Sequence, residues 1–376
     1  MAAIEILADF LKGRHTLGQM VNLAKYSFSK KKSVVNWDPI DISIFITVRC
    51  NLSCDMCLTH STKFSNPWGQ KPTKDVDFEL FKQILTRYKN ALTVNLIGNG
   101  EPLLHKDLFK MIEYASTMMK MNVNSSSNGI AVGQYLEEIV NSPLKHFNIS
   151  INGHNREEFN RMTGMPSELF NVICNNTVEL MKRKRAKGSR LKIAATFILD
   201  QGNYRCLEDM IYFADSLEVD QIVFFQFLPS PVEGFTAEER CLFADDAEVI
   251  ATLAKVNSLP PRIREKVTLP VLLDRTIDNN KYCTVWLYNI SIDGDRNVGG
   301  CCCQLLDLSV SGKLDEGYPW NNAYFQEMRR RFIDPMYPLL EPCTWCYNNS
   351  SYIRDWSMIS NPISRLARRL SHLLQK

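Results

Sequence analysis

The chain has 376 residues, a length that suits one large domain or a barrel with a smaller module attached. Hydrophobic residues make up 45% and charged residues 23%, as in an ordinary globular protein, and the formal net charge is +3. This small charge argues against a nucleic-acid partner, and no apolar run is long enough to span a membrane. The N-terminus also lacks the pattern of a signal peptide, so we expect a cytoplasmic protein.

The first 230 residues predict a helical extension followed by a repeating β–α pattern. Residues 1–39 are expected to form one or two helices. Six strands are then expected at ISIFITV (42–48), LTVNLIG (92–98), NVNSSS (122–127), HFNISI (146–151), LKIAATFIL (191–199) and QIVFFQFL (221–228), each followed by a helical pattern except the last. Nearly continuous apolar runs of this kind are typical of parallel strands covered on both faces. Residues 40–230 therefore predict an α/β fold, a partial (β/α)6 TIM-like barrel with its chemistry at the C-terminal strand ends.

The remaining residues divide into three expected segments. Residues 231–280 are expected to connect the barrel to residues 281–350, a small C-terminal β-hairpin/α domain that is rich in cysteine, glycine and tryptophan. Residues 351–376 end in a basic stretch with leucines at helical spacing, which predicts an amphipathic helix. We favour packing of this helix on its own protein, and peripheral contact with an anionic membrane is the alternative.

Three cysteines follow the first expected strand. The chain has 12 cysteines, and in a reducing compartment clustered cysteines are more often metal ligands than disulfides. Cys50, Cys54 and Cys57 have the spacing C-x3-C-x2-C. A structural zinc site takes four ligands, and His60 can supply the fourth. A 4Fe–4S cluster held by three thiolates leaves one iron open to another ligand.

This cysteine loop resembles that of the radical S-adenosylmethionine (SAM) superfamily. The resemblance implies that Cys50, Cys54 and Cys57 ligate a 4Fe–4S cluster and that SAM binds the remaining iron. It also implies reductive cleavage of SAM to a 5′-deoxyadenosyl radical, which takes a hydrogen atom from the substrate. Met56 stands where the family often has an aromatic residue near the adenine, and a thioether can also contact a ring.

The second expected strand ends in GNGEPLL. Glycines let the backbone approach a ligand closely. Gly98, Asn99, Gly100, Glu101 and Pro102 resemble the family's Gly-Gly-Glu-Pro motif, which implies contact with the SAM amino group, and Asn99 replaces a glycine there. An ordinary Gly/Pro turn is the alternative. A dinucleotide fingerprint does not fit, because its third glycine is missing.

Polar residues at the later strand ends extend the predicted cofactor site. Ser127 and Asn128 follow the third strand, and the resemblance implies that they lie near the SAM carboxylate and ribose. Ser150 and Asn152 occupy a position that often contains Ser-x-Asp-Gly in the family. For Gln226 in the sixth strand, and for Asn203 after the fifth, a structural role is as plausible as contact with the cofactor.

A second group of cysteines lies near the C-terminus. Cys283 and Cys301 flank an expected hairpin with its turn at Asp293–Gly294, and Cys343 and Cys346 form a C-x2-C pair. Four thiolates suit zinc or a 4Fe–4S cluster. Behind such a barrel they resemble the SPASM and Twitch domains, and the shorter Twitch form fits better because the C-x5-C-x3-C part of SPASM is missing. The resemblance implies one auxiliary 4Fe–4S cluster, in which Cys302 or Cys303 can replace Cys301.

The resemblance implies a radical SAM oxidoreductase or epimerase supplied by an external one-electron donor such as flavodoxin or ferredoxin. The short extension ahead of the barrel favours a small polar substrate that resembles a sugar or an aminocyclitol. A lipid-linked form of such a substrate is included in this expectation. A redox-neutral reaction needs a hydrogen-atom donor, for which Cys206 and Cys241 are candidates, together with Cys174. A peptide-modifying enzyme and a non-catalytic zinc or cluster scaffold are the alternatives.

Overall fold

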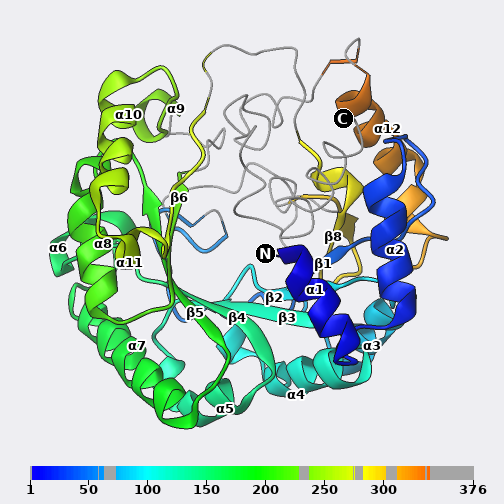
Figure 1. Ribbon diagram of the computed structural model, residues 1–376, viewed down its shortest axis with the longest axis horizontal. Coiled ribbons are helices and arrows are strands. Elements are labelled where there is room, and N and C mark those ends of the chain that lie inside the picture. Colours follow the sequence, from blue (N-terminus) through cyan, green and yellow to red (C-terminus); the bar gives the residue numbers. More distant parts are fainter. Residues whose placement is uncertain are drawn as a thin grey trace.

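The fold is built on one curved sheet with helices along its outer side (Figure 1). The computed structural model describes residues 2–57, 59–62, 73–227, 237–273, 275, 283–301, 311–334 and 337–338. The strand order is β7-β6-β5-β4-β3-β2-β1-β8-β9, and every neighbouring pair is parallel except β8 and β9. The first six strands are β1 (Asp41–Phe45), β2 (Thr93–Ile97), β3 (Asn122–Ser127), β4 (Leu144–Ser150), β5 (Lys192–Leu199) and β6 (Gln221–Gln226). The predicted α/β fold with a partial TIM-like barrel is confirmed.

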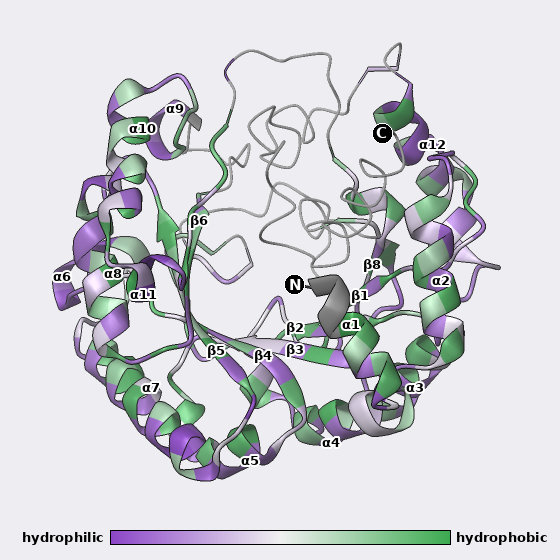
Figure 2. Ribbon diagram, in the orientation of Figure 1, coloured by the Kyte–Doolittle hydropathy of each residue, from purple (hydrophilic) through white to green (hydrophobic). Residues whose placement is uncertain are grey.

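Helices connect these strands and cover them. The connecting helices are α3 (Phe78–Arg87), α4 (Leu108–Glu113), α5 (Leu136–Asn141), α6 (Arg156–Thr163), α7 (Glu168–Lys187) and α8 (Leu207–Ser216). Asp77 and Asn155 begin α3 and α6, because each side chain accepts a hydrogen bond from a backbone amide of the first turn. Figure 2 shows hydrophobic residues concentrated on the strands and on parts of these helices. Parallel strands end at one edge of the sheet, so the loops after β1 to β6 gather there.

The region between β6 and β8 contributes more than a connection. It contains α9 (Ala237–Arg240), α10 (Ala247–Ala254), α11 (Pro261–Arg264) and β7 (Val267–Thr268). Ile222 and Val223 of β6 pair with Val267 and Thr268 of this short strand. The sequence analysis did not predict β7, because two residues are too few to show a strand period.

The predicted C-terminal hairpin exists and extends the barrel sheet. β8 (Asn289–Ile292) and β9 (Val298–Gly299) are antiparallel. β8 also pairs in parallel with β1, from Asp41 opposite Asn289 to Ile44 opposite Ile292. The hairpin therefore shares the sheet of the strand that leads into the cysteine loop.

Both ends of the described chain pack on this side of the barrel. α1 (Ala2–Leu11) and α2 (Leu17–Phe28) form the predicted helical extension, and α12 (Ala323–Ile333) lies near α2 (Figure 1). Arg329 of α12 is fully buried and donates hydrogen bonds to the carbonyls of Trp286, Trp320 and Ser33. None of the helices that the structure describes is long and apolar enough to cross a membrane.

Candidate functional site

Three thiols lie together in the loop after β1. Cys50, Cys54 and Cys57 are all half-buried and none forms a disulfide. Burial, and then the proximity of Cys57 and Cys50, raises the pKa of Cys54 to about 12. Burial also raises the pKa of Cys50, with Glu101 and Cys57 acting in the same direction. Thiols that oppose one another's ionisation become stable thiolates when a cation joins them, so this donor set fits a metal cluster.

Asp75 fixes the three residues ahead of the first cysteine. Its carboxylate accepts hydrogen bonds from the Thr47 hydroxyl at 2.8 Å, the Val48 amide at 3.0 Å and the Arg49 Nε at 3.0 Å. Arg49 in turn donates from Nη2 to the Leu104 carbonyl at 2.9 Å. The loop is thus held on its N-terminal side to the segment that follows β2.

The far side of the loop is held by the end of α6. The Asp55 amide donates to the Thr163 carbonyl at 2.8 Å. Gly164 ends α6 with φ +67°, and a Cβ at this position would lie 2.2 Å from the Asp55 carboxylate. A glycine is required here for both reasons. Within the loop, the His60 amide donates to the Cys57 sulfur at 3.3 Å.

The GNGEP turn runs alongside the strand that enters the cysteine loop. The Gly100 amide donates to the Thr47 carbonyl at 3.1 Å, and the Glu101 amide donates to the Arg49 carbonyl at 2.7 Å. A Cβ on Gly100 would lie 1.9 Å from the Arg49 carbonyl oxygen, so only glycine fits. Gly98 and Asn99 form the half-buried start of this turn, and Pro102 begins the short 3-10 helix Pro102–Leu104.

Glu101 connects the ends of β2 and β3. The residue is 2% exposed, and its two carboxylate oxygens accept from the Leu103 amide at 3.1 Å and the Asn128 amide at 2.6 Å. Burial raises the pKa of Glu101, although the amides and the Ser127 hydroxyl oppose this. Both oxygens bind the protein itself, so this carboxylate shapes the turn whether or not a ligand is bound.

Asn128 brings the third strand end to the cysteine loop. Its side-chain amide donates to the Asn51 side-chain oxygen (Oδ1) at 2.7 Å and lies 3.9 Å from the Cys50 sulfur. Ser127 is buried, and its hydroxyl accepts from the Gly129 amide at 3.0 Å. The structure therefore gathers the cysteine loop, the GNGEP turn and the SSSNG turn at one edge of the sheet.

Ser150 and Asn152 lie at the end of β4. Ser150 accepts a 3.4 Å hydrogen bond from the Thr196 hydroxyl. Asn152 has φ +56°, a left-handed conformation that asparagine tolerates better than most residues. Such backbone positions are often found at functional sites. Both residues are half-buried at the edge where the chemistry is expected.

Gln226 and Asn203 use their side-chain amides in hydrogen bonds within the protein. The Gln226 amide donates to the Val271 carbonyl and accepts from the Leu242 amide, which fixes the segments around β6. The Asn203 side chain donates to Glu158 at 2.9 Å and to the Ile198 carbonyl at 3.0 Å. Hydrogen bonds of this kind occupy the amide groups that the sequence analysis assigned as candidate cofactor contacts.

The two candidate hydrogen-atom donors lie in different surroundings. Cys241 is fully buried in an apolar cluster with Phe227, against which Met56 also packs. The Cys241 thiol donates to the Phe227 carbonyl at 3.3 Å, and burial raises its pKa to about 12. Cys206 instead lies with His154 and Asp209, whose ligand atoms are within 4.8 Å of one another. Only Cys241 shares a cluster with a residue of the cysteine loop. Cys174 on α7 packs against the main core.

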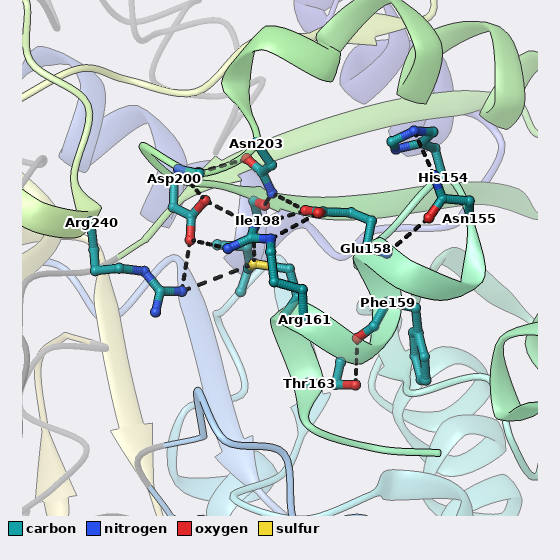
Figure 3. Close-up of polar contacts among 12 residues, drawn as sticks. His154, Asn155, Glu158, Phe159, Arg161, Thr163, Ile198, Asp200, Asn203 and Arg240 are labelled. Carbon is teal, nitrogen blue, oxygen red and sulfur yellow. Dashed lines mark hydrogen bonds and ion pairs between the residues drawn. The ribbon is translucent and has the colours of Figure 1, made fainter. Parts of the chain in front are cut away.

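A buried ion-pair network supports α6, and sequence reasoning missed it. Asp200 is fully buried at the end of β5 and pairs with Arg161 at 3.0 Å and Arg240 at 2.7 Å (Figure 3). Arg161 also pairs with Glu158 at 2.8 Å. The same helix ends at Thr163, which holds the cysteine loop. The one available signal was that Asp200 directly follows an expected strand.

The C-terminal cysteines are only partly described. Cys283 is half-buried and Cys301 is buried, and both pack against the main core. Cys302, Cys303, Cys343 and Cys346 lie outside the described residues, as do residues 351–376 with the predicted amphipathic helix. The Asn289 side chain, at the start of β8, donates a hydrogen bond to the Gly300 carbonyl at 3.0 Å, which brings the neighbouring Cys301 near the start of that strand. Because β8 is parallel to β1, this is the end of the sheet opposite the Cys50 loop.

These observations define an α/β partial barrel with a three-thiol loop and glycine-rich turns at the C-terminal edge of its sheet. Residues 44–210 match the family model described as the radical SAM superfamily. The match includes the cysteine loop, the GNGEP turn and the ends of β3 to β5. Residues 44–210 are thus a radical SAM domain.

Two relatives are similar to this chain over more than half of its length. The chain is 23% identical over 232 residues to a probable GTP 3′,8-cyclase from Metallosphaera sedula, which covers 61% of this chain and 69% of the relative. A probable GTP 3′,8-cyclase from Methanococcus aeolicus is 25% identical over 205 residues, 53% of this chain and 62% of that protein. The chain thus spans about two thirds of the length of these relatives.

Two solved structures share the fold. Native anSMEcpe with bound AdoMet has a TM-score of 0.58 and 15% identity, with 88% of this chain and 95% of that chain covered. Streptococcus suis SuiB bound to its precursor peptide SuiA has a TM-score of 0.55 and 14% identity, with 85% and 69% covered. At these identities the similarity concerns the fold.

Proposed function

We propose that this chain abstracts a hydrogen atom from a small polar substrate and thereby oxidises or epimerises it. When bound, a 4Fe–4S cluster with SAM supplies a 5′-deoxyadenosyl radical for this step. The observation that carries the proposal is the convergence of three half-buried thiols with the GNGEP and SSSNG turns at one sheet edge. The preferred substrates are sugar- or aminocyclitol-like compounds, free or lipid-linked. Nucleotides are added as candidate substrates because the chain is similar to proteins named GTP 3′,8-cyclase.

The chain's own residues have distinct roles in this proposal. Cys50, Cys54 and Cys57 would hold the cluster. The half-buried backbone of Gly98–Gly100 and the polar ends of β3 and β4 would bind SAM, while Met56 offers an apolar surface beside Phe227. Open turns of this kind suit the binding of an amino acid group through backbone atoms.

The C-terminal cysteines support an auxiliary cluster in the proposal. Cys283, Cys301, Cys343 and Cys346 would supply four thiolates and leave no iron open to substrate. The contact of Asn289 with Gly300, and the register of β8 with β1, bring Cys301 to a level about four residues of β1, or about 13 Å, below the end of that strand. A cluster there suits electron transfer, which an oxidation requires for its second electron.

The experiment is SAM cleavage by anaerobically reconstituted protein with dithionite. Wild-type protein should form 5′-deoxyadenosine, and Cys54→Ala should abolish it while retaining iron at the C-terminal cysteines. Cys174→Ala is the matched control, because Cys174 is also a half-buried thiol but lies on α7. Zinc in place of iron, without 5′-deoxyadenosine, would support a non-catalytic scaffold instead.

Substrate class is tested separately by incubating the enzyme with sugars, aminocyclitols, nucleotides and peptides. A small polar substrate should raise the rate of 5′-deoxyadenosine formation above the uncoupled rate. Stimulation by peptides alone would favour the peptide-modifying alternative. If epimerisation is observed, Cys241→Ser should stop turnover and leave SAM cleavage intact.

A further inference from the structure

The second helix presents apolar side chains to solvent. In α2, Leu17, Val21 and Phe28 are 68%, 46% and 61% exposed. Their spacing of four and seven residues sets them in one stripe along the helix. The opposite face of α2 is the buried one, through Gln19, Asn22 and Leu23.

Polar anchors fix the orientation of α2, and its inner face also packs Leu23, Met20 and Tyr26 against an apolar cluster. The Gln19 side-chain amide donates to the carbonyls of Ala91 at 2.9 Å and Met119 at 3.0 Å. The Asn22 amide donates to the Asp38 carbonyl at 3.1 Å. An ordinary surface helix buries its apolar side and exposes its polar side. Here the anchored amides prevent the helix from turning its apolar stripe inward, so this stripe remains available to a partner.

The neighbouring residues enlarge the apolar area. Leu7 and Leu11 of α1 are 53% and 77% exposed, and Val34 after α2 is 54% exposed. Six of the fifteen large exposed apolar side chains in the described part of the chain fall between residues 7 and 34. Single exposed apolar residues are normal, but a concentration of them marks an interaction site.

The same segment is strongly cationic. Between residues 7 and 34 the segment contains one carboxylate, that of the buried Asp9, which pairs with Arg14 at 2.9 Å. It contains six cations, which are Lys12, Arg14, Lys25, Lys30, Lys31 and Lys32. The formal charge of the whole chain is only +3, so this segment differs sharply from the average surface.

We propose that residues 7–34, the N-terminal surface, dock on an anionic lipid membrane. Apolar side chains on a helix with lysines beside them insert at the interface while the lysines contact lipid phosphates. A nucleic acid would leave the leucines and Phe28 exposed. The chain's own residues 361–376 carry Arg365, Arg368 and Arg369, which the six cations would repel. A second copy of this chain carries the same six cations, so two N-terminal surfaces would repel one another. The proposal does not depend on the reaction proposed above.

The test is flotation of the full reconstituted chain with lipid vesicles. The protein should float with vesicles of phosphatidylcholine and phosphatidylglycerol and should remain behind with phosphatidylcholine alone. Higher salt should weaken the binding, because it screens exposed charges. An absence of binding to the anionic vesicles would overturn the proposal.

Two groups of variants locate the contact. Lys25→Gln/Lys30→Gln/Lys32→Gln should lower the partition coefficient about a hundredfold. Leu17→Gln/Phe28→Gln should lower it strongly at every salt concentration. The matched control is Val172→Gln/Val178→Gln on α7, which changes two other exposed apolar residues and should leave binding unchanged. Iron content and SAM cleavage, measured on each variant, should equal wild type and so report that the barrel is intact.

Three results would contradict the assignment. The first is binding that neither group of variants alters. The second is binding lost only in Leu366→Gln/Leu370→Gln, which would assign the contact to the C-terminal segment. The third is a dimer in sedimentation that Leu17→Gln/Phe28→Gln dissociates, which would make a second copy the partner.

Discussion

Glu101 is the residue on which the geometry of two turns depends. Its two oxygens accept separate amides, from Leu103 and Asn128. Glutamine has one carbonyl oxygen, so Glu101→Gln directs an NH₂ group at one of these N–H donors. We expect a loss of about 1–3 kcal/mol in the free energy of unfolding. We also expect weaker SAM binding by calorimetry. Glu113→Gln, on the exposed side of α4, is the control and should match wild type.

Asp75 makes the approach to the cysteine loop sensitive to acid. Burial acts to raise the pKa of Asp75, but the Val48 amide, the Thr47 hydroxyl and Arg49 outweigh it, so the pKa is lowered. A depressed folded-state pKa means that the stabilisation is present above the unfolded value of about 3.9 and is lost as the pH falls below it. In urea unfolding, Asp75→Asn should be less stable than wild type at neutral pH. The difference should shrink as the pH falls from about 3.9 toward the lower folded-state pKa, and a difference that does not change with pH would contradict this account.

At the scale of elements, α6 connects the Asp200 ion pairs to the cysteine loop, because Arg161 binds Asp200 and Thr163 binds Asp55. Asp200→Asn leaves Arg161 and Arg240 without their shared carboxylate at a fully buried position. Both arginines are partly exposed, so the cost is mainly that of the hydrogen bonds lost at the buried position, and we expect about 1–3 kcal/mol in unfolding free energy. Iron incorporation should fall as well, because Thr163 holds Asp55. The exposed Arg205–Glu248 pair provides the comparison, and Glu248→Gln should change little.

The elements themselves were largely predictable, and their roles in the site only partly so. Most of the long strands were predicted because they are apolar runs such as KIAATFIL in β5, although β3, with the sequence NVNSSS, is mainly polar. The gathering of the first three turns followed from the shared edge of parallel strands. Gln226 and Asp200 show the limit of this reasoning. Which partner a polar side chain bonds depends on segments distant in sequence, here Val271 and Arg240, and periodicity carries no such information.

At the scale of the molecule, Arg329 joins the two ends of the described chain. Its guanidinium donates to three carbonyls and to the Asn321 side chain, and it pairs with no carboxylate among the residues that the structure describes. Arg329→Met would leave these buried oxygens without donors. We therefore expect the free energy of unfolding, measured with guanidinium chloride as denaturant, to fall by about 3 kcal/mol. Arg330→Met, whose side chain is 44% exposed, should cost far less. Equal stability of the two variants would refute the proposed joining role of Arg329.

The pairing of β1 with β8 also has a consequence for biosynthesis. Asp41 pairs with Thr93 on one side and with Asn289 on the other. At ribosomal rates the second neighbour emerges on the order of ten seconds or more after β1 itself. During that time the strand that leads into the cysteine loop has an open edge, a known template for aggregation. The nascent chain therefore presents its thiols early and completes their supporting sheet late, so the timing of iron delivery and chaperone protection should affect the yield of active enzyme.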